Sequence, residues 1–141
     1  AVEMFLTRSG ELLVNETGPR AHNSRHHTSE ACHSSQFDRL LRVYLGWPLG
    51  DTTLRDHAAM INLVGEGGTG LPQLIGSHEV LDLPAAFPHL YGKVETRTGR
   101  KMGHVTVLAK DHAGLDAAIT RVKEHCRVVP RGATITNTNR S

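Results

Sequence analysis

The sequence lacks the marks of a membrane-spanning, secreted or disulfide-rich protein. Its apolar runs fall far short of the roughly 20 residues that cross a bilayer, and no signal-peptide pattern is present. Cys32 and Cys126 lie far apart and form no Cys-x-x-Cys pair, which excludes a disulfide framework and a zinc ribbon. We expect both to be buried free thiols on the apolar faces of helices, in a cytoplasmic protein.

Neither sign of charge dominates the chain. The 16 lysines and arginines against 14 acidic residues give a formal net charge of +2, and the basic residues are scattered. This argues against a general nucleic-acid binder, which would show a basic stripe. A P-loop is also missing, because the glycine-rich segment 65–70 is not followed by Lys-Ser or Lys-Thr. We expect that segment to be a flexible surface turn.

The length of 141 residues fits one ordinary domain or two small pieces of a larger one. Residues 1–6 are β-prone from the start and follow no initiator methionine, which predicts a C-terminal fragment of a longer enzyme. The Thr- and Asn-rich end of the chain predicts a flexible tail over residues 130–141.

A β-hairpin is predicted at the start of the chain. Residues 2–7 and 12–16 are β-prone, and turn residues lie between them. A turn centred on Ser9 and Gly10 would make Thr7 face Leu12.

In that register Glu3 lies directly opposite Glu16. Two like charges opposed on one sheet face are destabilising. A divalent cation between them would remove the repulsion, and magnesium prefers such carboxylates together with substrate phosphates. The alternative is a pair of solvated glutamates, since a slip of one residue in the register would separate the carboxylates.

The loop over residues 17–27 is rich in Gly, Pro, Asn and His, a composition that is typical of functional loops. Arg20 offers a planar fork for a carboxylate, phosphate or bicarbonate, or else a surface salt bridge. His22, His26 and His27 are candidate metal ligands, but no cysteine or second spaced histidine pair completes a zinc set.

A helix is predicted after this loop, because apolar residues recur at helical spacing. These residues are Phe37, Leu40, Leu41, Tyr44 and Leu45. Ser34 or Ser35 is the expected cap, Thr28 is an earlier possible start, and Gly46 and Pro48 end the helix. We expect this helix to be scaffold that fixes the loop before it.

The second half of the chain predicts strands over residues 58–64 and 104–109, followed by an amphipathic helix capped by Asp111. The apolar positions of that helix are Leu115, Ala118, Ile119, Val122 and Cys126.

A group of cations punctuated by glycines precedes the strand over residues 104–109. Its members are Lys93, Arg97, Arg100, Lys101 and His104. Glycines let a backbone approach a ligand closely, and clustered cations suit a phosphate group. The alternative is a solvated basic loop.

Four segments, in this order and spacing, resemble the C-terminal third of carboxyaminoimidazole ribonucleotide synthetase, a family of the ATP-grasp superfamily in de novo purine biosynthesis. They are Val2-Glu3-Met4-Phe5, Asn15-Glu16 with Pro19-Arg20 and His22-Asn23-Ser24-x-His26, Ser35-Gln36-Phe37, and Tyr91-Gly92-Lys93-x-Glu95-x-Arg97-x-Gly99-Arg100-Lys101-Met102-Gly103-His104. The resemblance covers about residues 1–110, and the two longer motifs together are highly specific.

The resemblance implies a reaction. ATP and bicarbonate form carboxyphosphate, whose carboxyl group passes to the amine of aminoimidazole ribonucleotide. ATP and Mg²⁺ are the implied cofactors, and aminoimidazole ribonucleotide and bicarbonate are the implied substrates. No covalent nucleophile is implied, so catalysis would consist of positioning and electrostatics.

The family match also implies roles for the first cluster. Glu3 and Glu16 would hold the metals, and Asn15 with Glu16 would line the ATP site. Arg20 would hold bicarbonate or carboxyphosphate.

His22, Asn23 and Ser24 would position the reacting amine and carboxyl group, so that Arg20, His22 and Asn23 are the implied catalytic residues.

Lys93 and Arg100 would bind the 5′-phosphate of the ribonucleotide, with Arg97 and Lys101 as second choices. One departure stands out, because Arg25 occupies a position where the family usually has glycine.

The implied fold class is α+β, with the C-terminal part of an ATP-grasp domain over residues 1–46 and a small mixed α/β domain over 47–129. The implied partners are the missing N-terminal part of the same enzyme and, as a possibility, a second copy in a homodimer. We expect the isolated chain to be inactive, and neither a nucleic acid nor a membrane as a partner.

Two other functions are considered. A sister ATP-grasp ligase, such as the formate-dependent glycinamide ribonucleotide transformylase, shares the metal carboxylates, and the loop from Arg20 to His26 would discriminate it. The second is a non-catalytic phosphate-binding module without an ATPase half.

Overall fold

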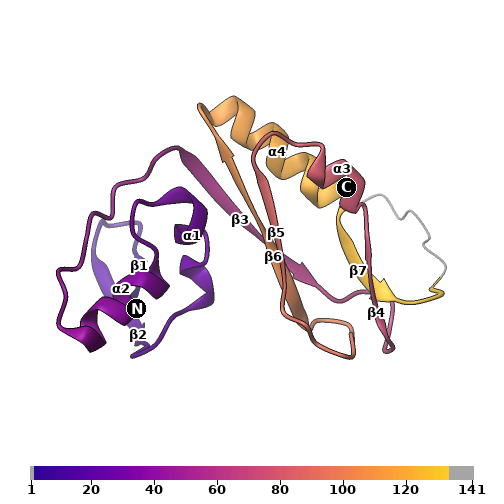
Figure 1. Ribbon diagram of the computed structural model, residues 1–141, viewed down its shortest axis with the longest axis horizontal. Helices are drawn as coiled ribbons and strands as arrows, with labels where there is room; N and C mark the ends of the chain where they lie inside the picture. The colour runs from indigo at the N-terminus through magenta and orange to yellow at the C-terminus, as the bar shows by residue number, and fades with distance from the viewer. Residues whose placement is uncertain (1, 134–141) are drawn as a thin grey trace. The chain divides into compact units, whose positions relative to one another are not determined.

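The computed structural model describes residues 2–133, which form two compact units divided after Arg55 (Figure 1). The division lies later than the expected boundary at residue 46. The chain after the helix returns to the first unit, where the His33 N–H donates to the Thr53 carbonyl at 3.3 Å and the Arg55 N–H donates to the Ala31 carbonyl at 2.7 Å.

The first unit opens with a hairpin of β1 (Val2–Leu6) and β2 (Leu12–Thr17). Leu6 faces Leu12, so the predicted pairing of Thr7 with Leu12 is wrong by one residue. The turn is longer than predicted, because the Thr7 N–H donates to the Glu11 carbonyl at 2.9 Å. Gly10 completes it in a left-handed conformation at φ 86°.

A β-bulge at Asn15 restores the predicted pairing of the glutamates. Met4 pairs with Val14, whereas Glu3 pairs with Glu16, so Asn15 is an extra residue in β2. The predicted opposition of Glu3 and Glu16 is therefore confirmed, although the turn that was expected to produce it differs.

Helices complete the first unit. After the 3-10 turn η1 (Asn23–Arg25) and the short α1 (Thr28–Ala31), the predicted helix is confirmed as α2 (Gln36–Leu45). The Ser35 hydroxyl caps α2 by accepting from the Asp38 N–H at 3.0 Å.

The apolar stripe of α2 is not buried, since no residue of this helix is fully shielded from solvent. Cys32 is a buried free thiol, as predicted. It does not lie on a helix face, because it follows α1, and its backbone forms an isolated antiparallel β-bridge with Leu54.

The second unit is built on an antiparallel sheet in the order β3-β6-β5. Its strands are β3 (His57–Val64), β5 (Ala86–Leu90) and β6 (Lys101–Ala109). The predicted strands over residues 58–64 and 104–109 are confirmed, and β5 was missed.

The predicted second helix is α4 (His112–His125), capped by the Asp111 carboxylate, which accepts from the Gly114 N–H at 2.7 Å. It packs on the sheet to form the core of this unit. The buried core residues are Leu63, Val80, Met102, Val105, Val107, Val122, Cys126 and Val128.

Three short elements complete the unit. Helix α3 (Ser77–Leu81) lies beside α4, and β4 (Pro72–Ile75) pairs with β7 (Arg127–Pro130) in a separate two-stranded sheet. None of the three was predicted.

Pro130 therefore ends a strand, while residues 134–141 of the predicted tail lie outside the described residues. In the described part of the chain, no helix combines the length and apolar character that a bilayer crossing requires.

Candidate metal and phosphate sites

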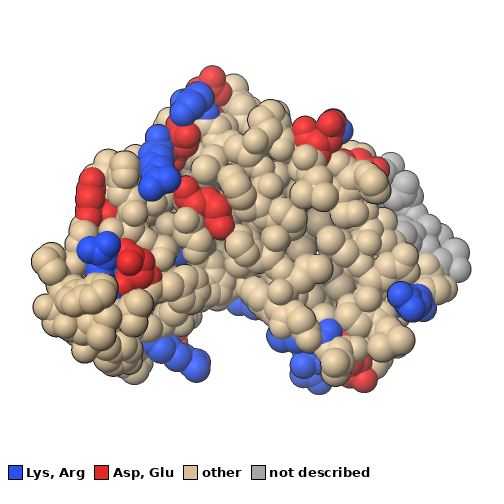
Figure 2. Space-filling view, viewed as in Figure 1, with Lys and Arg blue, Asp and Glu red and all other residues tan. Residues whose placement is uncertain are grey.

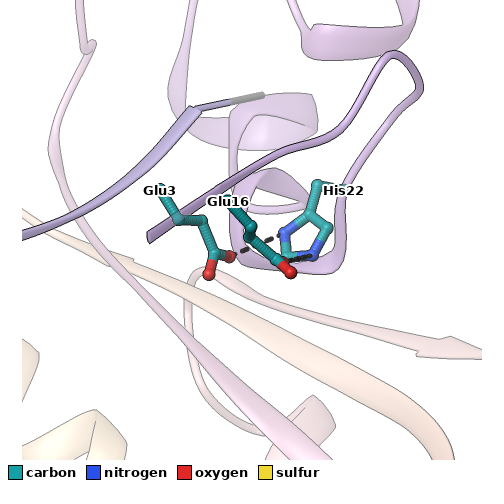
Figure 3. Close-up of side chains that lie close together, drawn as sticks. All are labelled: Glu3, Glu16 and His22. Carbon is teal, nitrogen blue, oxygen red and sulfur yellow. Dashed lines mark ion pairs between the residues drawn. The ribbon is translucent and has the colours of Figure 1, made fainter. Parts of the chain in front are cut away.

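Three side chains converge beside the bulge of the hairpin (Figure 3). Glu3 and Glu16 come from opposite strands, and the His22 imidazole from the following loop lies against both carboxylates. His22 Nδ1 is 3.1 Å from Glu3 Oε1, and His22 Nε2 is 3.7 Å from Glu16 Oε1. The side chains of Glu3 and His22 are each 34% exposed, so the cluster is open to solvent.

The imidazole is held in place by its neighbours. His22 precedes η1, and its Nδ1 lies 2.9 Å from the Ser24 hydroxyl. The Gln36 carboxamide accepts from the His22 N–H at 2.8 Å and donates to the His22 carbonyl at 3.0 Å. The amide of Gln36 also contacts His26 Nδ1 at 2.8 Å.

Gln36 is the first residue of α2, so this helix fixes the loop before it, as predicted. The role of Gln36 itself was missed. The available signal was its place directly after the helix cap, where a side chain can reach back to the preceding loop.

The donor set of the acid pair fits a divalent cation. One ligand atom from each of Glu3, Glu16 and His22 lies within 4.8 Å of the others. Carboxylate oxygens are the ligands that magnesium prefers, and an imidazole nitrogen suits several divalent metals. A cation would also offset the repulsion between the opposed carboxylates. Within residues 2–133 no other group of three such side chains converges, and His26 and His27 take no part in this one.

The remaining predicted residues of the first unit surround this cluster in the sequence. Asn15 is the bulge residue beside Glu16, and Asn23 begins η1. Arg20 is exposed, and no carboxylate of the described residues pairs with it, so the predicted alternative of a surface salt bridge is not found.

Of the predicted cations of the second unit, Lys93, Arg97 and Arg100 lie on the connection between β5 and β6, and Lys101 begins β6. Lys93 and Arg100 are half-buried and are tied to the backbone of this connection. The Lys93 ammonium donates to the Lys101 carbonyl, and Arg100 Nη1 donates to the Glu95 carbonyl at 2.9 Å. An ammonium has three N–H donors and a guanidinium has five, so both side chains keep donors for an anion.

Figure 2 shows lysine and arginine side chains gathered at the end of this unit where the β5–β6 connection lies in Figure 1. Arg97 and Lys101 are exposed there. His104 behaves differently, because it is only 5% exposed, stacks on His89 at 4.6 Å between ring centroids and lies 3.0 Å from the Tyr91 hydroxyl through Nδ1. The imidazole of His104 is packed within the sheet and is not an exposed side chain.

Two family models match the chain. The ATP-grasp domain matches residues 1–37, and the phosphoribosylaminoimidazole carboxylase C-terminal domain matches residues 58–118. The N5-carboxyaminoimidazole ribonucleotide synthase of Bacillus subtilis is 47% identical over 108 residues, which are 77% of this chain and 27% of that protein.

Solved structures agree with these matches. The N5-carboxyaminoimidazole ribonucleotide synthetase from Thermotoga maritima is 48% identical with a TM-score of 0.87, over 92% of this chain and 36% of that chain. The N5-carboxyaminoimidazole synthase from Aspergillus clavatus, solved with ADP and 5-aminoimidazole ribonucleotide, is 34% identical with a TM-score of 0.69, over 86% of this chain and 32% of that chain.

The fold and the matched segments define the C-terminal end of an ATP-grasp domain followed by a small C-terminal domain, and the predicted α+β fold class is confirmed. The chain is similar to the C-terminal part of the N5-carboxyaminoimidazole ribonucleotide synthetases. It spans between 20% and 28% of the length of the curated relatives it matches.

Proposed function

We propose that this chain supplies the C-terminal portion of an ATP-dependent ligase of purine (IMP) biosynthesis. The ligase carboxylates the amine of 5-aminoimidazole ribonucleotide with bicarbonate by way of carboxyphosphate. The observation that carries this proposal is the convergence of Glu3, Glu16 and His22 at the bulge, within the segment that matches an ATP-grasp domain. Because the chain covers about a quarter of its relatives, turnover requires the preceding part of the enzyme.

Glu3 and Glu16 would hold Mg²⁺, and Asn15 with Glu16 would line the ATP site. When bound, the metal neutralises the charge on the phosphates as the γ-phosphoryl group is transferred. His22 lies against both carboxylates, so it orients them and contributes a third donor or, when protonated, a compensating charge.

Arg20 would hold bicarbonate or carboxyphosphate through its planar fork, which matches the geometry of these anions. Its lack of a carboxylate partner among the described residues leaves the guanidinium available for such a ligand. His22, Asn23 and Ser24 would position the amine and the carboxyl group. This arrangement lowers the barrier by orientation and by charge stabilisation.

Lys93 and Arg100 would bind the 5′-phosphate of the ribonucleotide. Charge-assisted hydrogen bonds from these side chains to phosphate are stronger than bonds between neutral groups, and the arginine can make two parallel bonds to one phosphate. The Aspergillus clavatus relative was solved with ADP and 5-aminoimidazole ribonucleotide, which supports an adenine nucleotide and this ribonucleotide as the molecules that the complete enzyme binds. A homodimer and a cytoplasmic location stay predictions.

The test is a chimera in which this chain replaces the corresponding C-terminal part of the Bacillus subtilis synthase. We expect ADP release that depends on both bicarbonate and aminoimidazole ribonucleotide, and no ADP release from the isolated 141-residue chain. Glu3→Gln in the chimera should lower kcat by about 100-fold or more, because a metal ligand is lost. Glu11→Gln, in the hairpin turn, is the matched control and should leave kcat unchanged.

The same assay separates the alternatives. Activity with formate and glycinamide ribonucleotide would assign the chain to the sister transformylases instead. A chimera that folds and binds phosphate but releases no ADP would favour a non-catalytic phosphate-binding module.

A further inference from the structure

The glycine-rich segment over residues 65–70 is exposed at residues 67–69, as a surface turn would be, but its two ends are anchored. It is hydrogen-bonded to the connection that carries Lys93 and Arg100. The Gly65 N–H donates to the Arg100 carbonyl at 2.8 Å, and the Gly99 N–H donates to the Gly65 carbonyl at 3.0 Å. Both the N–H and the carbonyl of Gly65 are therefore hydrogen-bonded to the turn that carries Arg100.

A second set of bonds joins the same two segments further along. Thr96 and Gly70 form an antiparallel bridge, with the Thr96 N–H donating to the Gly70 carbonyl at 2.8 Å and the reverse bond at 3.1 Å. The Gly68 N–H donates to the Thr98 hydroxyl at 3.2 Å. Thr96 is fully buried at this junction, so the connection is anchored over several residues.

Glycine is required at position 65 by close approach. Gly65 is buried, and a Cβ atom added there would collide with the Thr96 hydroxyl and with the Arg97 carbonyl. The Arg97 carbonyl accepts from the Arg100 N–H at 3.0 Å and so closes the turn. Any side chain at position 65 would therefore displace the turn from which the Arg100 side chain extends.

We infer that Gly65 is a positioning residue for phosphate binding, because it locks the β5–β6 connection in the geometry that presents Lys93 and Arg100 to the same phosphate group. The inference rests on the proposed function, in which these two cations bind the 5′-phosphate. The ligand class is a phosphate monoester, and Gly65 itself does not touch it.

Gly76 is a matched control for this inference. It lies in the same unit, and a Cβ atom there would also collide with backbone, at the His125 carbonyl. Its neighbours are α3 and the end of α4, away from the hydrogen bonds that hold the β5–β6 connection. Gly76→Ala should therefore destabilise the unit without disturbing Lys93 and Arg100.

The experiment is a residue-resolved NMR titration of the 141-residue chain with ribose 5-phosphate and, in parallel, with inorganic phosphate. In the unmodified chain we expect saturable shifts at Lys93 and Arg100. Gly65→Ala should weaken binding about tenfold, which corresponds to the loss of one hydrogen bond to a charged group. Thr98→Val removes one anchoring bond without crowding and should weaken binding about threefold.

The outcomes separate the inference from the function on which it rests. If the unmodified chain shows no saturable shifts at Lys93 and Arg100 with either probe, the proposed phosphate site fails, and the inference with it. If it binds and the folded Gly65→Ala variant binds equally well, only the inference is overturned. Should Gly65→Ala fail to fold, unchanged binding by Thr98→Val overturns it, as does an equal loss in Gly76→Ala.

Discussion

At the scale of single residues, the site loop tolerates a departure from the family pattern. Arg25 occupies a position where the resemblance led us to expect glycine, yet its backbone is not in the left-handed region that glycine favours. Its side chain is exposed at the end of η1, and its carbonyl accepts from the Thr28 hydroxyl at 2.6 Å. The backbone at position 25 therefore has no need of glycine.

Cys126 gives a prediction at the same scale. Burial raises the pKa of its thiol to about 11 from an ordinary value of 9.0, because the thiolate is poorly solvated. The folded state thus favours the neutral thiol, and this contribution to stability is complete below pH 9 and is lost as the pH rises toward 11. We expect the free energy of unfolding of the second unit to fall over this range, by about 2 kcal/mol from this group.

The measurement is urea unfolding from pH 8 to pH 11, followed by a probe in the second unit. Cys126→Val is the matched variant, because it keeps an apolar side chain but has no proton to lose. The difference in stability between the two proteins should shrink or reverse as the pH rises. A constant difference across this range would contradict the prediction.

At the scale of elements, the N-terminal cap of α2 supports the loop of the candidate site. The Ser35 hydroxyl caps the helix, and the next residue, Gln36, holds the backbone of His22. Ser35→Ala should cost about 1 kcal/mol of helix stability. The first turn of α2 would then open more often, and Gln36 would no longer be fixed at the helix start. Residues 22–26 should become more mobile as a result, because Gln36 holds the backbone of His22.

Hydrogen exchange of the amides in residues 22–26 measures this effect. We expect faster exchange in Ser35→Ala and near-normal exchange in Ser35→Asp, since aspartate also caps helices well. Equal protection in all three proteins would show that the loop is held independently of the cap.

The elements also show what the sequence could and could not predict. Long periodic segments gave α2, α4, β3 and β6, because burial of one face leaves a clear pattern. The missed elements β4, β5, β7 and α3 have only 4 or 5 residues each, too few for a period to emerge.

The candidate site was predicted in part for a similar reason. The opposition of Glu3 and Glu16 followed from strand pairing, but the compensating bulge at Asn15 left no local signal. The anchoring role of Gly65 was missed because it depends on contacts with residues 30 or more positions further along the chain. Local composition does not predict contacts over such a separation.

At the scale of the whole molecule, the hairpin of the first unit presents exposed apolar side chains. Apolar residues lie exposed on both strands of the hairpin, among them Phe5 at 59% and Leu13 at 45%, which pair across the strands. Contiguous exposed apolar surface of this kind marks an interface with further protein. The preceding part of the ATP-grasp domain, which the relatives possess and this chain does not cover, is the occupant that we expect.

This expectation gives opposite results in two settings. In the isolated chain, Phe5→Ser with Leu13→Ser should reduce self-association, measured by sedimentation velocity, because the apolar patch becomes polar. In the chimera with the Bacillus subtilis synthase, the same two substitutions should abolish ADP release or prevent assembly, because they would face the core of the ATP-grasp domain. Leu81→Ser, at an equally exposed position of α3, should do neither. If the double variant stayed fully active in the chimera, the hairpin face would be a true surface, and the placement of this chain within an ATP-grasp domain would have to be revised.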